Sequence, residues 1–566
     1  MTACNGLNKK MGEPEKEKER TSMKAKKVLA MLMASAMIMG TTVTAFAADN
    51  IIGNSDDTGT ITVSGIKYEA GITVTAYPII KAVYNNNDNS FSGYETLYPG
   101  IIDATPDTQR NINVTLEELN QVLAKIKSGQ GSTTSYQLTD ENQDGSYVSE
   151  NILPVGSYLV VIEGAEEKIY NPVVASISYG TENGSNDLKD DEVNVITDGT
   201  SWTKVSSNPT IEKTVSDDDG DVDEEGKGNS AAIGETVYYE VDINPVPYYG
   251  GDYPVLNVVD TLSAGLTYNN DLKVYRVTKN EESVETEVEL SANEYYDLTY
   301  NDINKTITVN FVKDTTPNVA DDGKNYTLNS FAGEVVRIKY SATVNENAVV
   351  NAGGNNNDVT LNYTQDSKVT GDEKEDKDKT YTYTFDIDGA TTKQVITKTG
   401  EGNESLALEG AKFKLYTDEK CTNEYHNSKY DKGLNDGYLV STDEGQLYMT
   451  GLEAGKYWLK EEAAPEPYTV NTHVFAIEIK TEYNDNGTLK NWKVTIDGVD
   501  VKTFTVKHDA PNGFEASGNG LDIKNTKISN LPSTGGIGTT IFTIGGCAIM
   551  VTAAGLYFAT RKKEQN

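Results

Sequence analysis

The C-terminus of this chain holds three consecutive parts whose order could anchor the protein in a membrane. The first is a five-residue motif, Leu531-Pro532-Ser533-Thr534-Gly535. An apolar run at 541–559 follows, and a basic tail then includes Arg561-Lys562-Lys563. Five residues alone occur by chance in many proteins, whereas this order of three parts is much more specific. At the least, it indicates a transmembrane segment placed behind a turn.

The other end of the chain has the layout of a secretory signal peptide. Residues 23–48 contain a basic start, a short apolar run and the small-x-small pattern Ala45-Phe46-Ala47. We expect cleavage after Ala47 or Ala48. Residues 1–22 form a charged N-terminal extension, and the sequence leaves open whether Met1 or Met23 is the start.

The composition indicates an exported, strand-rich protein. A length of 566 residues favours three or four domains. The 49 Lys and Arg against 86 Asp and Glu give a net charge of −37, which argues against nucleic-acid binding because that needs a basic face. Tyr is frequent (34) and alternates with Thr, Val and polar residues, as in β-strands.

Cysteine and histidine usage excludes several kinds of site. Cys4 precedes the signal peptide and Cys547 lies in the C-terminal apolar run, so only Cys421 stays in the mature protein and no intramolecular disulfide is available. The histidines lack metal-ligand spacing, and we expect no metal and no cofactor. No nucleophile elbow or phosphate loop is present, so we expect no enzyme activity. The three histidines are His426, His473 and His508.

The pattern along the chain predicts an all-β fold of tandem β-sandwich domains. We place an N-terminal extension and signal peptide at 1–48, and domains at 49–203, 204–390 and 391–528. The C-terminal segment follows at 529–566. Alternating stretches that predict strands are 61–63, 72–77, 236–241 and 335–340.

One amphipathic helix is expected, at 115–127 in the first domain. Thr115 can cap it, with Glu118 three residues on as its partner. Its apolar residues fall on one face, which we interpret as a core face. No helix is expected in the third domain. The apolar face consists of Leu116, Leu119, Val122, Leu123 and Ile126.

The acidic run at 217–225 is the remaining candidate for a metal site. It resembles a calcium loop only loosely, because it lacks the spacing and the terminal Glu of an EF-hand. A solvated acidic turn is the better interpretation, although the sequence leaves metal binding by the acidic loops open.

Two segments of the first domain match two of the third. Residues 153–159 match 452–459, and 71–77 match 410–416, so these domains are expected to be the same kind of sandwich. The third-domain segments, with Leu408-Glu409-Gly410-Ala411 and the Gly451-to-Tyr468 pattern, resemble the collagen-adhesin B-type immunoglobulin-like domain. The resemblance implies immunoglobulin-like sandwiches.

The middle domain resembles the isopeptide-forming second domain of pilus backbone subunits. The C-terminal order of parts is similar to the cell-wall sorting signal of Gram-positive surface proteins. As a whole, the chain is similar to a major pilin of a sortase-assembled pilus. The matching residues of the middle domain are Pro209-x-x-x-Lys213, Ile233-Gly234-Glu235-x-Val237, Asp260 to Tyr268, and Asn357-x-Val359-x-Leu361-x-Tyr363.

In such domains a Lys and an Asn form an internal amide and ammonia leaves. The amine attacks only when neutral, so it must be desolvated, and a buried carboxylic acid can protonate the amide. The trio is expected on a first, a last and a middle strand. In the third domain the pattern falls on Lys398, Asn525 and Glu461. In the second it falls on Lys213, Asn357 and Asp260, with Asn355, Asn356 and Asn362 close to Asn357.

The first domain lacks this set. Aligned on the matching segments, the position of Lys398 becomes Gly59 or Val63, and that of Glu461 becomes Ile162. Because both the amine and the acid are missing, we predict that this domain has no internal bond.

The resemblance also implies the partners. A pilus sortase would cut between Thr534 and Gly535 and pass the threonyl carbonyl to a lysine of an identical subunit. A housekeeping sortase would fix the base to peptidoglycan, and minor pilins or surface ligands could join. The Tyr-Pro-Lys context of the family's acceptor lysine is absent here; Lys204 is our candidate, with Lys189 and Lys168 as alternatives.

Two functional hypotheses remain at this point. The first is a structural backbone subunit of a covalent pilus on the cell surface. The second is a monomeric wall-anchored adhesin, or a minor pilin, with the same stalk domains. We favour the backbone subunit because no extra region that could bind a ligand stands out.

Overall fold

A computed structural model gives the fold of most of the chain. The N-terminal extension, most of the signal peptide, the motif at 531–535, the acidic residues 218–225 and Lys189 lie outside the described residues. The structure describes residues 43–44, 53–104, 111–112, 114–131, 134–180, 195–217, 226–249, 255–279, 284–311, 331–366, 373–401, 406–528 and 538–563.

The chain divides into two units, each of which is described by itself. The first comprises Met1–Lys227, Thr236–Thr343 and Asn356–Tyr381, and the second comprises the rest, including Thr382–Asn566. The predicted domains at 49–203 and 204–390 fall mainly in the first unit, and the domain at 391–528 falls in the second. The domain boundaries themselves stay predictions.

The first domain is a sheet that wraps around an apolar core. Its strands are neighbours in the order β13-β12-β10-β4-β7-β8-β3-β14, and β5 pairs with β4. Val63 of β3 and Ile177 of β12 lie in the same buried cluster, so the two ends of the sheet face one another across this core. The elements are β1 (Val43–Thr44), β2 (Thr58–Gly59), β3 (Ile61–Ser64), β4 (Thr73–Tyr84), β5 (Phe91–Thr96), β6 (Asn111–Ile112), α2 (Leu116–Lys127), β7 (Tyr136–Thr139), β8 (Ser146–Ser149), β9 (Leu153–Pro154), β10 (Gly156–Glu163), β11 (Lys168–Tyr170), β12 (Val173–Gly180), β13 (Val195–Thr197), β14 (Gly199–Trp202) and β15 (Val205–Ser207).

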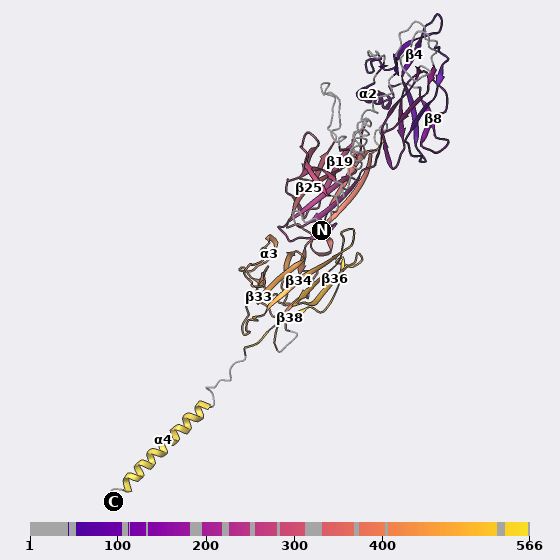
Figure 1. Cartoon of the computed structure of the whole chain (residues 1–566). Coiled ribbons are helices and arrows are strands. Elements are labelled where there is room, and N and C mark those ends of the chain that lie inside the picture. The colour runs from indigo at the N-terminus through magenta and orange to yellow at the C-terminus, as the bar shows by residue number, and fades with distance from the viewer. Residues whose placement is uncertain are drawn as a thin grey trace, which may run out of the picture. The chain divides into compact units, whose positions relative to one another are not determined.

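The helix α2 covers the other face of this sheet, as Figure 1 shows. Thr115 caps it, and Glu118 returns the hydrogen bond to the cap as predicted. Val122 and Leu123 are fully buried against Leu159 of β10. The strand β10 packs against the core on one face and against α2 on the other. Its residues are therefore buried on both faces, and apolar and polar residues do not alternate along it.

The strand expected at 72–77 is longer in the structure. β4 continues to Tyr84 because the pairing with β10 shifts by one residue next to Pro78. Such an irregularity accommodates a proline, which cannot donate to a regular ladder.

The second domain packs two sheets face to face. One has the order β16-β18-β25-β21-β22, with β20 beside β25, and the other contains β27-β26-β19-β24-β23. The strands expected at 236–241 and 335–340 are present as parts of β18 and β25. The elements are β16 (Thr210–Ser216), β17 (Gly228–Ser230), β18 (Thr236–Asn244), β19 (Leu256–Leu262), β20 (Leu266–Tyr268), β21 (Lys273–Lys279), β22 (Glu285–Glu289), β23 (Asp297–Asn301), β24 (Thr306–Asn310), β25 (Val335–Val344), η2 (Asn351–Gly353), β26 (Asn355–Thr364) and β27 (Glu373–Tyr383).

The third domain is built on a seven-stranded sheet, β31-β30-β33-β34-β35-β36-β37. Within the predicted range 391–528, the first and last strands, β29 and β38, pair in parallel outside this sheet. The elements are β28 (Phe385–Ile387), β29 (Ile396–Gly400), β30 (Lys412–Tyr416), α3 (Ser428–Lys432), β31 (Leu439–Val440), β32 (Met449–Leu452), β33 (Gly455–Ala463), β34 (Val474–Tyr483), β35 (Leu489–Ile496), β36 (Val499–Val506), β37 (Phe514–Ser517) and β38 (Leu521–Asn525).

The expectation that the third domain has no helix was wrong. α3 is a single helical turn, started by Asn427, whose side chain accepts hydrogen bonds from the backbone N–H groups of Lys429 and Tyr430. A single turn is too short for apolar residues to recur at helical spacing, so the sequence shows no helical pattern there. The cap at the start of the turn stabilises it. The all-β prediction for the chain is confirmed, because strands dominate all three domains.

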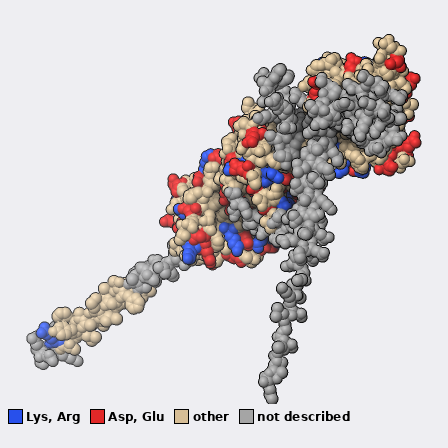
Figure 2. Space-filling view, turned by 45° about the horizontal axis from the view of Figure 1, so that its top comes forward, with Lys and Arg blue, Asp and Glu red and all other residues tan. Residues whose placement is uncertain are grey.

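The C-terminal apolar run forms the helix α4 (Gly538–Lys563). Its residues Ile541–Phe558 are long and apolar enough to cross a membrane and are not buried against the protein. Figure 2 shows this helix almost free of charge, with Lys and Arg at its end, whereas acidic residues are spread over the β domains. This fits the predicted segment at 541–559.

Candidate isopeptide clusters

Lys398, Asn525 and Glu461 meet in the interior of the third domain. Lys398 on β29 pairs with Ile523 on β38, which puts Asn525 two residues further along the same strand. Lys398 Nζ donates a hydrogen bond to Asn525 Oδ1 and lies 3.3 Å from Glu461 Oε2. Asn525 Nδ2 donates to Glu461 Oε1 at 2.6 Å. All three residues are at most 2% exposed.

This arrangement suits the attack of an amine on an amide. Burial lowers the pKa of the Lys398 amine, which favours its neutral, nucleophilic form. One oxygen of Glu461 faces the amine and the other faces the amide nitrogen. The carboxyl can therefore take a proton from the amine and deliver one to the leaving nitrogen. The backbone oxygen of Ile523 also accepts from Lys398 Nζ, at 3.2 Å, and helps to hold it.

Lys213, Asp260 and Asn357 form a second buried cluster, between the two sheets of the second domain. Lys213 lies on β16 of one sheet, and Asp260 and Asn357 lie on the neighbouring strands β19 and β26 of the other. Lys213 Nζ is 2.5 Å from Asp260 Oδ2, and all three residues are at most 3% exposed. Burial lowers the pKa of Lys213 and raises that of Asp260, so both groups are shifted towards their neutral forms.

Tyr340 is a fourth member of this cluster that the sequence analysis did not name. Its hydroxyl accepts a hydrogen bond from Lys213 Nζ at 2.9 Å and from Asn357 Nδ2 at 2.7 Å, and donates to Asp260 Oδ2 at 2.8 Å. Its ring stacks on Tyr239 with 5.0 Å between centroids. The alternation of β25 could have indicated that Tyr340 points into the core. Val336, Ile338 and Tyr340 lie at every second position of this strand, and all three are buried.

The geometry distinguishes Asn357 from its neighbours. Asn357 is fully buried and points at Tyr340. Its strand β26 is followed by β27, so the expectation that the Asn would lie on the last strand was wrong for this domain. The other asparagines bond elsewhere: Asn355 to the backbone of Val349 and Thr382, Asn356 to Asp358, and Asn362 to Asn257.

The first domain has apolar residues where the third has its cluster. Its strands β3 and β14 also pair in parallel, and Val63 opposite Ser201 corresponds to Lys398 opposite Ile523. Ile162 pairs with Val74 just as Glu461 pairs with Phe413. Val63 and Ile162 are both buried in the core. The position that corresponds to Asn525 is Thr203, two residues after Ser201. The Thr203 hydroxyl donates a hydrogen bond to the backbone oxygen of Asn171 at 2.7 Å.

Lys204, the candidate acceptor, lies just before β15. Its side chain is half-buried, and Nζ lies 3.1 Å from the centroid of the Tyr248 ring. This burial lowers the pKa of the amine. Of the two alternatives, Lys168 on β11 donates to Ser207 Oγ at 2.8 Å, and Lys189 is outside the described residues.

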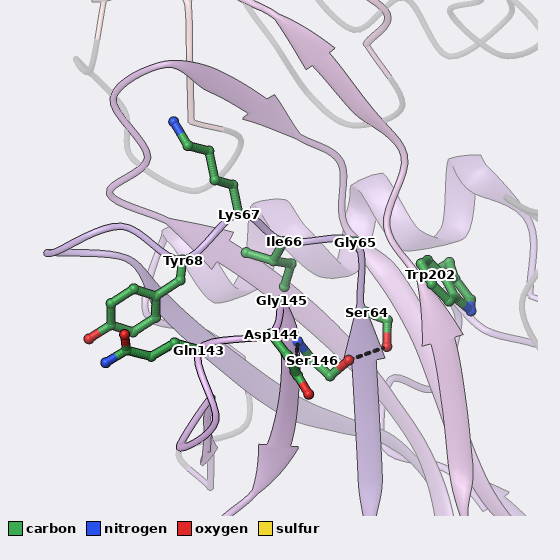
Figure 3. Close-up of a pocket in the computed structure, with 10 residues that line it drawn as sticks. All are labelled: Ser64, Gly65, Ile66, Lys67, Tyr68, Gln143, Asp144, Gly145, Ser146 and Trp202. Carbon is green, nitrogen blue, oxygen red and sulfur yellow. Dashed lines mark hydrogen bonds between the residues drawn. The ribbon is translucent and has the colours of Figure 1, made fainter.

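A hollow of 380 Å³ lies on the surface of the first domain (Figure 3). Trp202, two residues before Lys204, stands at its edge and is 66% exposed. The amine in its lining, Lys67, is paired with Glu167 at 2.5 Å, so we assign it no reaction. Within the described ranges, no group of His, Cys, Asp and Glu is arranged to hold a metal ion. The lining residues are Ser64, Gly65, Ile66, Lys67, Tyr68, Gln143, Asp144, Gly145, Ser146 and Trp202.

Three protein families match separate parts of the chain. Residues 56–206 match the T6 antigen Ig-like domain, 392–493 match a prealbumin-like fold domain, and 523–566 match the LPXTG cell-wall anchor motif. The chain combines a T6-antigen Ig-like domain and a prealbumin-like fold domain with a cell-wall anchor motif. The anchor places it at the cell surface, with α4 as the membrane segment that follows the motif.

A full-length relative supports this assignment. The trypsin-resistant surface T6 protein of Streptococcus pyogenes serotype M6 is 27% identical, over 90% of this chain and 96% of the relative. That relative is a surface protein.

Two solved pilins are similar to this chain at low sequence identity. The T6 backbone pilin of serotype M6 S. pyogenes is 20% identical, with a TM-score of 0.48, and the comparison covers 85% of this chain and all of that one. The major pilin SpaD of Corynebacterium diphtheriae is 16% identical, with a TM-score of 0.41, and covers 86% of this chain and all of that one.

Proposed function

We propose that this protein is the backbone subunit of a covalent surface pilus, stiffened by internal Lys–Asn amide bonds in its second and third domains. The observation that carries the proposal is the pair of fully buried Lys–Asn–acid clusters in a chain that ends in a cell-wall anchor. A buried lysine beside an acid is costly to keep for stability alone, whereas it is needed if the amine is to react.

The joining reaction forms the fibre. A pilus sortase cuts between Thr534 and Gly535 and transfers the threonyl carbonyl to Lys204 of the next subunit. A housekeeping sortase then links the basal subunit to peptidoglycan. The half-buried amine of Lys204, with its lowered pKa, supports its choice as the acceptor.

Intact-mass spectrometry of the mature protein tests the internal bonds. We expect two losses of ammonia, about 17 Da each, because two of the three domains hold the required set of side chains. Peptide mapping should locate the cross-links at Lys213–Asn357 and Lys398–Asn525. No loss would refute the bonds, and three losses would mean that the first domain reacts despite Val63 and Ile162.

Denaturing gels of a cell-wall extract test the polymer. A covalent fibre should resist boiling in detergent and run as a ladder of high molecular weight. A single band would instead favour the monomeric wall-anchored adhesin, because the internal bonds and the anchor fit that protein equally well.

A further inference from the structure

We propose that Tyr340 is a catalytic residue that carries a proton between the two reacting nitrogens of the second domain. This inference rests on the Lys213–Asn357 bond proposed above. It adds a fourth residue to the reaction, and it gives this residue a role that the third domain does not need.

The position of the hydroxyl carries the proposal. Tyr340 Oη is 2.9 Å from Lys213 Nζ, the nitrogen that must lose a proton, and 2.7 Å from Asn357 Nδ2, the nitrogen that must gain one. It is also 2.8 Å from Asp260 Oδ2. No contact within hydrogen-bonding distance links Asp260 to Asn357 Nδ2 among the described residues, so the hydroxyl, rather than the acid, reaches the leaving nitrogen.

The third domain shows why a bridge is needed here. There, the two oxygens of Glu461 reach the amine and the amide nitrogen directly, at 3.3 and 2.6 Å. Asp260 has one methylene fewer, and only its Oδ2 makes contacts, with Lys213 and with Tyr340. A tyrosine hydroxyl adds the reach that the shorter acid lacks, because it can accept one proton while it donates another.

Burial keeps the hydroxyl suitable for this role. Tyr340 is 4% exposed, and burial beside Asp260 raises its pKa well above the usual value, so the group stays protonated. Two buried oxygens nearby, Asp260 Oδ1 and Asn357 Oδ1, have no hydrogen-bond donor in the described part of the chain. A proton taken from Lys213 onto the Asp260 carboxyl would supply a donor where the cluster lacks one.

The reaction balances with these four groups. Lys213 first passes one proton to Asp260, which leaves a neutral amine and a neutral acid. Lys213 Nζ then bonds to the Asn357 side-chain carbon and loses one further proton to Tyr340 Oη. The hydroxyl gives its own proton to Nδ2 as the carbon–nitrogen bond breaks. Ammonia leaves, and Tyr340 and the amide product are both neutral.

The test follows bond formation over time in the full chain. After a pulse of labelled synthesis, the cross-linked peptides of Lys213–Asn357 and Lys398–Asn525 are quantified by mass spectrometry. In Tyr340→Phe, the second-domain bond should form about 100-fold or more slowly, the usual loss when a proton-transfer group is removed. The third-domain bond should form at the normal rate and serves as the internal clock.

Two further variants separate chemistry from packing. Tyr239→Phe removes the hydroxyl of the stacked neighbouring ring, which makes none of the three contacts above, and should leave the rate unchanged. In the Tyr340→Phe background, Asp260→Glu restores the reach of the acid and should recover much of the rate. A purely structural role of Tyr340 would not be rescued in this way.

The outcomes are distinct. Normal bond formation in Tyr340→Phe overturns the inference alone, and so does equal slowing in Tyr239→Phe. Absence of the second-domain bond in the unaltered chain overturns the proposed bond itself and this inference with it. Slow formation in Tyr340→Phe together with rescue by Asp260→Glu supports the proton transfer.

Discussion

Glu461→Ala is expected to leave the third domain without its internal bond and to destabilise it by at least about 4 kcal/mol. The proposed cross-link joins residues that are 127 positions apart, and closing a loop of that length removes about 4–5 kcal/mol of unfolded-chain entropy. Without the acid, the amine has no group to take its proton, and Lys398 is left buried without its partner.

Calorimetry and mass spectrometry together measure this effect. The melting temperature of the third domain should fall on the order of 15 °C, and one of the two ammonia losses should disappear. Glu462→Ala is the matched control, because Glu462 is the next residue on β33 and its partly exposed side chain contacts Lys460 and Tyr416. A Glu461→Ala chain with both mass losses and an unchanged melting temperature would contradict the proposed role.

Replacement of Lys204 is expected to abolish the polymer ladder altogether. Lys204→Ala removes the amine that would accept the threonyl carbonyl, so only monomers could reach the wall. Lys204→Arg is the sharper variant, since it preserves the positive charge and a cation over the Tyr248 ring but offers no amine for transfer. Both variants should give a single band on denaturing gels of the cell-wall extract.

Lys168→Ala provides the control for this experiment. Lys168 lies opposite Ser207 in the β11–β15 pair, near Lys204, and also carries an amine. Its loss should leave the ladder intact. A ladder that persists in Lys204→Arg would rule Lys204 out as the only acceptor, and a ladder lost in Lys168→Ala would point to Lys168 instead.

The two proposed bonds would brace their domains differently. In the third domain, Lys398 and Asn525 belong to adjacent parallel strands, so the bond ties the first strand of the domain to the last. In the second domain, Lys213 and Asn357 belong to opposite sheets, so the bond would link the two sheets covalently through the core. Tension that enters at the ends of the third domain would pass through its bond rather than through strand hydrogen bonds.

Most of the fold could be predicted from local patterns in the sequence. The helix at 115–127 was predictable because its cap and its apolar face are encoded within four-residue steps. The short helix α3 and the extension of β4 past Pro78 were not, because a single capped turn and a shift in pairing leave no period in the sequence. The position of Asn357 before the last strand was missed because the following strand, β27, consists largely of charged residues and shows no strand-like alternation of apolar residues.

The sequence by itself predicted the export and anchoring signals, the all-β class, the helix in the first domain and the two clusters, with the choice among neighbouring asparagines in the second domain left open. Each of these follows from residue type and spacing, or from resemblance to a family. Only the tertiary structure decided that Asn357, rather than its neighbours, joins the buried cluster, and that the Tyr340 hydroxyl contacts both Lys213 and Asn357. The physical reason is that β16 and β25 bring their side chains to one point across the sandwich from β19 and β26, and no local pattern specifies such a meeting.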